Sequence, residues 1–334
     1  MTHGPAGGNL RVAVVGVGKM GQNHARCLSS MKGVDLVAVV DTDRALGESV
    51  AASRGSRAVD SIDDLHGVEA VVVAVPTAQH AEIGCELMKR GIHCLVEKPL
   101  AGDSGDARLL LNTAEAVGVV LQVGHVERFN PAVRQLREVL ADERVLAVNA
   151  RRMNATSGRV TDIDVVMDLM IHDFDVVLSL MGGDTPTVVA RSVDGTSGHD
   201  HVTALLSFDD QRMASITASR ITQNQIRQLE VITEERFLTV DYSNQDLVIY
   251  RQGRVEGHAG NEAEVRYSLD VDIRKVFVRR REPLVEELEH FVGAVRGDHP
   301  CEVDGPEALR ALELVWAVQD ELRRGRLREP CRMD

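Results

Sequence analysis

The sequence predicts an α/β chain with two domains, on three observations. Its 334 residues suggest two domains at about 150 residues each. Up to about residue 125, short apolar runs alternate with helix-length segments, the pattern of βαβ units in a parallel sheet. Beyond that point, helical segments precede a series of short strands separated by Gly, Asp and Asn, which predicts an α+β domain with an antiparallel or mixed sheet.

The first domain is expected over residues 10–125, after a loose polar tail at 1–9. Its strands are short apolar runs, as expected for strands buried on both faces, and each stops at Gly, Asp, Pro or a charged turn. The expected strands are 11–15, 34–40, 68–75, 93–96 and 119–123, and the expected helices are 20–31, 43–54, 78–90 and 104–117.

The second domain is expected over residues 126–334, where the pattern changes. Helices are expected at 131–140, 165–180, 282–296 and 306–324, and strands at 186–194, 201–208, 212–220, 226–233, 236–242 and 246–251. The last helix is a candidate to pack back on the first domain. The stretch 186–252 predicts a sheet with one face uncovered by local helices. Such a face usually needs a partner, so we expect a homodimer or homotetramer.

Composition excludes several classes of function. Lys and Arg number 38 against 51 Asp and Glu, a net charge of −13, which argues against nucleic acid or an anionic membrane as the main partner. Aromatic residues make up 3% of the chain, too few for a platform that stacks nucleic-acid bases. No apolar stretch reaches about 18 residues, so we expect no transmembrane helix. Residues 1–9 have no charged stretch followed by an apolar run, so we expect no signal peptide and a cytoplasmic protein.

The cysteines also favour a reducing compartment. There are five, Cys27, Cys85, Cys94, Cys301 and Cys331, and no two of them form a CxxC pair. An odd number without such pairs disfavours both a disulfide framework and a zinc ribbon. We therefore expect free thiols.

A glycine-rich turn follows the first expected strand. Gly16, Gly18 and Gly21 form G-x-G-x-x-G with Lys19 and Met20 between the last two glycines. The first glycine permits a tight turn, the second lets the backbone approach a pyrophosphate, and the third lets the helix pack close to the strand. The helix N-terminus then offers free N–H groups to phosphates. A purely structural glycine turn is the alternative.

Asp41 ends the second expected strand about 20 residues after Gly21, where dinucleotide-binding proteins place the acid that binds the adenosine ribose. Its carboxylate can accept hydrogen bonds from both ribose hydroxyls and would repel a 2′-phosphate. We therefore expect NAD as the cofactor. NADP stays open as an alternative, because Arg44 is nearby and could serve a phosphate.

Further candidates follow the next two strands, at the sheet edge where ligands bind. Pro76, Thr77 and His80 are expected to line the cofactor, with a plain turn and a helix start as the alternatives. Glu97 and Lys98 precede a proline, which favours an extended backbone at the lysine and allows a cis peptide bond. A lysine aimed at a nicotinamide can donate a proton or polarise a carbonyl. The alternative is a surface lysine in a turn.

The second domain carries one dense polar cluster. Asp168 and His172 are spaced i and i+4 in a mostly apolar helical segment, so they are expected on one helix face. An Asp beside a His can orient the imidazole and raise its basicity. A divalent metal site and a purely structural hydrogen bond are the alternatives, and we expect no metal.

Together, the glycine motif with Asp41, the Glu97-Lys98-Pro99 run and the Asp168-x-x-x-His172 pair resemble the glucose–fructose oxidoreductase/inositol dehydrogenase (Gfo/Idh/MocA) family. Their order and spacing match it over about residues 10–325. The resemblance implies a Rossmann domain with a doubly wound parallel sheet and a C-terminal domain with a large open sheet. It also implies NAD(P)-dependent redox chemistry at a sugar or cyclitol hydroxyl, with Lys98, Asp168 and His172 in the active site.

Residues 124–131 and 168–175 look closest to the branch of the family that acts on nucleotide sugars. The type activity of that branch is oxidation of the 3-hydroxyl of UDP-N-acetylglucosamine. Arg128 and Asn130 are expected to position the substrate, with helix capping or packing as the alternative.

An arginine cluster agrees with such a substrate. Arg151, Arg152 and Arg159 precede the Asp168 segment in an otherwise acidic chain, and guanidinium groups can hold a diphosphate. Solvated charges on a strand edge or loop are the alternative.

The expected mechanism is reversible hydride transfer. His172, oriented by Asp168, takes the hydroxyl proton, and Lys98 hydrogen-bonds the same oxygen. Three other functions remain as alternatives: an inositol or free-sugar dehydrogenase, a keto-sugar reductase of natural-product synthesis, and a non-catalytic dinucleotide-binding regulator.

Overall fold

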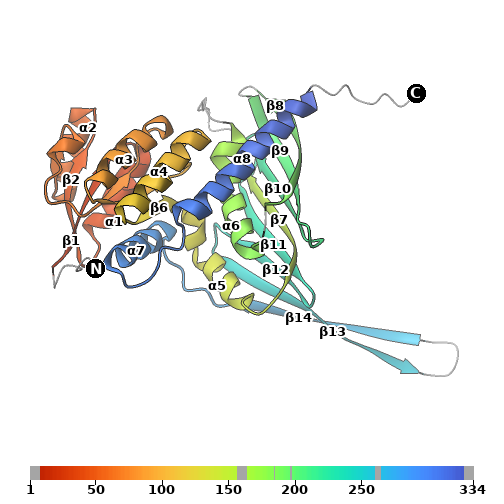
Figure 1. Cartoon of the computed structure of the whole chain (residues 1–334). Helices are drawn as coiled ribbons and strands as arrows, with labels where there is room; N and C mark the ends of the chain where they lie inside the picture. The colour runs from red at the N-terminus through yellow and green to blue at the C-terminus, as the bar shows by residue number, and fades with distance from the viewer. Residues whose placement is uncertain (1–7, 156–163, 184, 196–197, 260–264, 327–334) are drawn as a thin grey trace. The chain divides into compact units, whose positions relative to one another are not determined.

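The computed structural model describes residues 8–155, 164–183, 185–195, 198–259 and 265–326 (Figure 1). The chain forms two compact units. Unit 1 comprises the described residues up to Phe129 together with Arg281–Glu313, and unit 2 comprises those of Asn130–Arg280 and from Leu314 onward. The division by sequence differs from this one, because it placed everything after residue 125 in the second domain.

Unit 1 is built on a six-stranded sheet in the order β3-β2-β1-β4-β5-β6, and every neighbouring pair is parallel. Its strands are β1 (Leu10–Val15), β2 (Val34–Val40), β3 (Arg57–Val59), β4 (Ala70–Val73), β5 (His93–Glu97) and β6 (Leu121–Gly124). The strand order reverses between β1 and β4, and ligands of such sheets bind at the carboxyl ends of the strands beside this reversal. The expected doubly wound parallel sheet is confirmed. The three-residue edge strand β3 was not expected.

Helices and short 3₁₀ turns connect these strands. The helices are α1 (Lys19–Ser29), α2 (Arg44–Arg54), α3 (His80–Lys89), α4 (Ser104–Val117) and α7 (Pro283–Arg296), and the 3₁₀ turns are η1 (Ile62–Asp64), η2 (Thr77–Gln79) and η3 (Val126–Phe129). Leu284, Leu288 and Phe291 of α7 are buried in the same apolar cluster as β1 and α1. This burial is the physical reason why 281–313 belongs to unit 1.

Unit 2 contains an eight-stranded mixed sheet in the order β14-β13-β12-β11-β7-β10-β9-β8. Its strands are β7 (Val145–Met153), β8 (Thr187–Gly195), β9 (Gly198–Ser207), β10 (Met213–Ser219), β11 (Ile226–Thr233), β12 (Arg236–Asp241), β13 (Asp246–Ala259) and β14 (Val265–Val276). β7 pairs in parallel with β10, and the other neighbours are antiparallel. The expected mixed open sheet is confirmed, although its central strand β7 was not expected.

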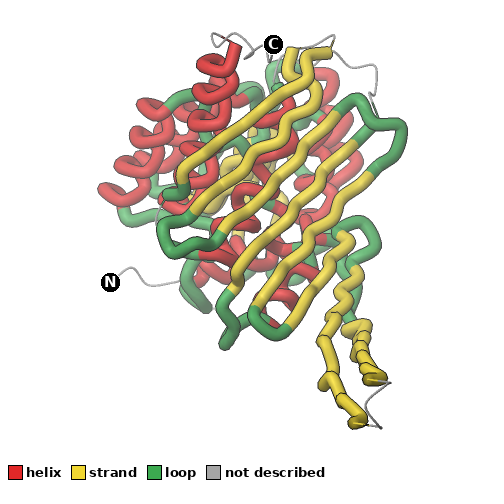
Figure 2. The backbone as a smooth tube through the Cα atoms, turned by 90° about the vertical axis from the view of Figure 1, so that its right-hand side faces the viewer, coloured by secondary structure: helices red, strands yellow, loops and turns green. Residues whose placement is uncertain are grey.

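The described helices of unit 2 are α5 (Pro131–Val139), the π-helical turn η4 (Val166–Met170), α6 (Ile171–Met181) and the later part of α8 (Gly305–Arg326). α5 and α6 contact the strands on one face of the sheet. Figure 2 shows the other face, on which no helix is drawn. No helix among the described residues is both long and apolar enough to span a membrane.

Candidate active site

The glycine-rich turn has the geometry that a dinucleotide requires. Gly16 has φ +83°, and a Cβ there would lie 2.7 Å from the Ala74 carbonyl oxygen. A Cβ at Gly21 would lie 1.8 Å from the Gly16 carbonyl oxygen, so only glycine fits at either position. At Gly18, by contrast, a Cβ would have no atom of the described residues within 4 Å apart from the glycine and its chain neighbours. Gly18 is the N-cap of α1, so this open space lies next to the helix N-terminus, which offers N–H groups to phosphate oxygens.

Next to this turn is a pocket of about 480 Å³ at the carboxyl ends of β1, β2 and β4. Its walls include Gly16, Gly18, Asp41, Asp60 and Pro76. The backbone N–H of Val17 donates to Oδ2 of Asp41 at 2.7 Å. This bond holds the carboxylate next to the glycine turn, where it can accept hydrogen bonds from ribose hydroxyls. The pocket therefore suits the adenosine half of NAD.

Other expected cofactor residues lie outside that wall. Lys19 and Met20 are exposed in the first turn of α1, and Thr77 begins η2. His80 is 1% exposed, and its ring lies between the carbonyl oxygens of Val75 and Pro99, each 3.0 Å from a ring nitrogen. Its contacts tie the turn after β4 to the turn after β5. They do not support the expected role of His80 in cofactor binding.

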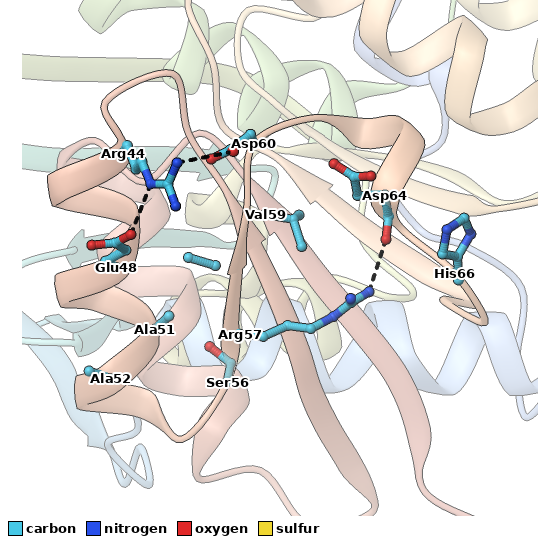
Figure 3. Close-up of a pocket in the computed structure, with 11 residues that line it drawn as sticks. Arg44, Glu48, Ala51, Ala52, Ser56, Arg57, Val59, Asp60, Asp64 and His66 are labelled. Carbon is cyan, nitrogen blue, oxygen red and sulfur yellow. Dashed lines mark hydrogen bonds and ion pairs between the residues drawn. The ribbon is translucent and has the colours of Figure 1, made fainter.

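Arg44 occupies a neighbouring site. Its Nε lies 3.0 Å from Glu48 Oε1 and its Nη1 lies 3.7 Å from Asp60 Oδ2, as Figure 3 shows. The guanidinium lines a second pocket of about 570 Å³, not the adenosine pocket. Asp60 lines both pockets.

Lys98 directly follows β5 and is joined to Pro99 by a cis peptide bond. The preceding residue, Glu97, is buried, with Oε1 2.6 Å from Nε2 of His24 in α1. Burial by itself raises the pKa of Glu97, but the hydrogen bond and charge of His24, with the charge of Lys98, outweigh it and lower that pKa. The backbone N–H of Lys98 donates to the other Glu97 oxygen at 3.2 Å. Glu97 thus anchors the backbone of Lys98 to the helix that follows the glycine turn.

His125 directly follows β6 and was not among the expected site residues. It is 1% exposed, and neither ring nitrogen has a hydrogen-bond partner among the described residues. Burial, followed by the charges of Arg128 and Lys98, lowers the pKa of His125 to about 3. The imidazole is therefore neutral at physiological pH.

Arg128 and Asn130 have internal partners. In unit 1, Arg128 is buried and donates to the Glu302 carbonyl oxygen at 3.3 Å and to the Glu307 carboxylate. In unit 2, Asn130 caps α5 and its Nδ2 donates to the Tyr242 carbonyl oxygen at 3.0 Å. These contacts agree with the capping and packing alternatives, and the positioning of substrate by both side chains stays a prediction.

The Asp168–His172 segment is not a regular α-helix. Asp168 lies in the π-helical turn η4, and His172 is the second residue of α6. Single π-helical turns inside α-helices often occur at functional sites. The expected α-helical i, i+4 geometry is corrected, because the wider turn alters how the two side chains are spaced.

A residue that sequence reasoning missed contacts the Asp168 carboxylate. Nη2 of Arg220, just after β10, lies 3.2 Å from Oδ2 of Asp168, and the Arg220 side chain is 13% exposed. The backbone N–H of Arg220 donates to the Asp200 carbonyl oxygen at 2.8 Å. Arg220 therefore places a positive charge on the carboxylate that was expected to orient His172.

The expected arginine cluster does not converge on one ligand. Neighbouring residues on a strand point to opposite faces. Arg152 is buried and forms two 2.9 Å hydrogen bonds with Asp173 of α6. Arg151 donates to Gln228 at 2.9 Å and to Glu230 at 3.0 Å. Arg159 lies outside the described residues. The expectation that Arg152 binds a diphosphate is therefore corrected, because Asp173 already occupies its guanidinium.

Comparison with known proteins adds the following. Residues 10–125 match a family model described as an oxidoreductase family with an NAD-binding Rossmann fold, and residues 151–328 match the C-terminal alpha/beta domain of an oxidoreductase family. The chain is 34% identical over 316 residues to a UDP-N-acetylglucosamine 3-dehydrogenase of Acidithiobacillus ferrooxidans, covering 93% of this chain and 96% of that protein.

A solved structure has the same fold, and a further relative is similar in sequence. The structure of a UDP-N-acetylglucosamine 3-dehydrogenase from Acidithiobacillus ferrooxidans matches with a TM-score of 0.86 and 30% identity, over 95% of this chain and 98% of that one. An inositol 2-dehydrogenase of Rhizobium meliloti is 24% identical over 326 residues, covering 92% of this chain and 96% of that protein.

Proposed function

The chain belongs to the Gfo/Idh/MocA family of oxidoreductases, with an NAD-binding Rossmann domain, and on that premise we propose that it oxidises the 3-hydroxyl of UDP-N-acetylglucosamine. One observation carries the choice of substrate: the 34% identity to a 3-dehydrogenase of this nucleotide sugar extends over 96% of that enzyme. Inositol dehydrogenases matched over similar lengths are 24% and 29% identical. Arg151 and Arg152 of β7 do not support this substrate, because their guanidinium groups bond to other side chains of unit 2.

In the proposed binding mode, the glycine turn and the N-terminus of α1 hold the pyrophosphate of NAD, and Asp41 accepts the ribose hydroxyls. The open side of Gly18 and the fixed Asp41 carboxylate support this mode. When bound, NAD supplies the acceptor for the hydride that leaves the sugar carbon.

The proposed proton transfer uses this chain's own side chains. His172 takes the proton of the hydroxyl that is oxidised, and Asp168, in contact with Arg220, orients the imidazole and stabilises its charged form. Lys98 donates a hydrogen bond to the same oxygen. One proton and one hydride leave the substrate, so the product is the 3-keto sugar.

The activity test is a substrate panel with NAD. UDP-N-acetylglucosamine, UDP-glucose, free N-acetylglucosamine and myo-inositol are compared by NADH absorbance, with mass spectrometry of each product. We expect turnover of UDP-N-acetylglucosamine to a product with two hydrogens fewer. Turnover of myo-inositol instead would favour the cyclitol alternative. NAD binding without turnover of any sugar would favour the regulator.

The proposed base has its own test. Because general base catalysis contributes about 10²–10⁴ in rate, His172→Ala should lower kcat at least about a hundredfold. Its Kd for NAD and its Tm should stay near those of the unchanged protein. Normal turnover in folded His172→Ala would exclude His172 as the base.

We also propose a cytoplasmic protein that forms a homodimer or homotetramer through the open face of the unit 2 sheet. The four described cysteines are free, which suits a reducing compartment. The exposed face of the sheet carries large apolar side chains, which suits a partner.

A further inference from the structure

We propose that Asp60 is a second cofactor-selecting carboxylate, which acts with Glu48 to keep Arg44 from serving a 2′-phosphate and so excludes NADP. The inference rests on the proposed binding of NAD beside Asp41. It concerns Asp60, which follows the edge strand β3 and which the glycine motif and the residue spacing do not indicate.

The position of Asp60 between two pockets carries the argument. Asp60 lines the adenosine pocket together with Asp41, and it also lines the neighbouring pocket that contains Arg44 and Glu48. Among the described residues that line the adenosine pocket there is no Lys or Arg, and two carboxylates face it. A ligand that carries extra negative charge on the ribose therefore meets like charge from both Asp41 and Asp60.

Arg44 is the cation that could offset this repulsion. It is the first residue of α2, three positions after Asp41, and its side chain is 73% exposed, so it has room to move. Its guanidinium lies between Glu48 at 3.0 Å and Asp60 at 3.7 Å (Figure 3). To bind a 2′-phosphate, Arg44 would have to leave both carboxylates. The local balance of three carboxylates against one guanidinium favours a 2′-hydroxyl.

Asp43 adds to the same selection. A phosphate is normally attracted to the N-terminus of a helix. Here the Asp43 side chain caps α2 by accepting the Leu46 N–H at 3.1 Å, so a carboxylate already occupies that end.

The test measures binding of NAD⁺ and NADP⁺ by calorimetry, without substrate. We expect Asp60→Asn to lower the Kd for NADP⁺ about threefold to fivefold, the size of an exposed charge pair, while the Kd for NAD⁺ stays within about twofold. Asp60→Ser removes the same carboxylate and should have the same effect, so the test does not depend on the folding of a single variant. In Arg44→Gln/Asp60→Asn most of the gain should be lost, because Arg44 supplies the new contact and only the relief of repulsion from Asp60 is left.

Asp64→Asn is the matched control. Asp64 is exposed, lines the Arg44 pocket and carries the same charge, but it does not line the adenosine pocket. Among the described residues, Arg44 forms its ion pairs with Glu48 and Asp60 and not with Asp64. An equal effect of Asp64→Asn would mean that net charge alone selects the cofactor, and the proposal would be overturned. The proposal would also be overturned if both Asp60 variants bound NAD⁺ and their Kd for NADP⁺ were unchanged. If the unchanged protein did not bind NAD⁺, the proposed cofactor site itself would be overturned.

Discussion

At the scale of single residues, the Asp168 carboxylate accepts a hydrogen bond from Arg220, which lies 52 positions later in the sequence. If Arg220 orients the carboxylate that in turn orients His172, its loss should act on turnover. We expect Arg220→Ala to lower kcat about tenfold or more, since a hydrogen bond between charged groups contributes about 1.5–3 kcal/mol. Arg220→Lys should restore part of kcat, because it keeps the charge.

The readouts separate this positioning role from a structural one. A structural role would lower the Tm in both Arg220 variants and leave the kcat of the folded fraction near normal. Arg151→Gln serves as the control, because Arg151 also pairs with a carboxylate of unit 2, that of Glu230, and forms no ion pair with Asp168 among the described residues. Steady-state kinetics and thermal melts of the three variants decide the matter.

His125 predicts an acid-dependent loss of stability. Its pKa is lowered to about 3 in the folded chain, against an ordinary value of 6.5. The unfolded chain therefore takes up a proton at a higher pH than the folded chain does. Above about pH 6.5, His125 causes no loss of stability. As the pH falls from 6.5 toward 3, the free energy of unfolding decreases by up to ~1.4 kcal/mol per pH unit.

The measurement is the Tm between pH 7 and pH 4. His125→Gln should flatten the decrease of Tm with falling pH, whereas the exposed His66→Gln should leave it unchanged. If both variants followed the unchanged protein, His125 would not be the buried neutral imidazole that its surroundings indicate.

These residues show what a sequence can indicate about a site. Gly16 and Gly21 could be predicted because the backbone there has room for no other residue. Asp41 could be predicted because its spacing from the turn places it at a strand end. The partners of Arg152 and Arg220 could not, because they come from α6 and η4, and pairing across a fold leaves no local pattern.

At the scale of elements, strong local signals led to correct predictions. The described helices of unit 1 lie close to the expected segments, because amphipathic spacing and caps such as Asp103 are local. Strand β3 is only three residues long, and β7 carries two arginines whose side-chain partners lie on α6 and β11. The π-helical turn η4 was missed because its hydrogen-bond register leaves no signature in apolar spacing.

One element gives a test of the two roles considered for Asn130, helix capping and substrate positioning. Asn130 caps α5 and holds the Tyr242 carbonyl, and both contacts are lost in Asn130→Ala. Loss of a cap costs about 0.5–2 kcal/mol, and a buried carbonyl left without its donor costs about 1–3 kcal/mol. We expect a clear decrease in Tm with little change in KM for the sugar.

The exposed cap Asp43 is the comparison. Asp43→Ala removes only a cap and should cost about 1 kcal/mol. If Asn130→Ala instead raised KM strongly and left the Tm unchanged, Asn130 would be a substrate residue, as first expected from the sequence.

At the scale of the whole molecule, the open face of the unit 2 sheet should decide the oligomeric state. Figure 2 shows this face without a covering helix. The exposed apolar side chains of its strands include Ile232 and Phe237, which are cross-strand partners, and Ile273, which is 60% exposed. Apolar side chains grouped on one sheet face are costly in water unless a second surface covers them.

We therefore expect a dimer or tetramer of the unchanged protein in light scattering at micromolar concentration. Phe237→Glu with Ile273→Glu should shift it toward monomer, because two carboxylates would be buried without partners in the interface. Leu109→Glu is the matched control, since Leu109 is 51% exposed on α4 of unit 1. A monomer in the unchanged protein, or an equal effect of the control, would contradict assembly through this sheet. Dissociation with an unchanged Kd for NAD⁺ would show that cofactor binding in unit 1 does not require the assembly.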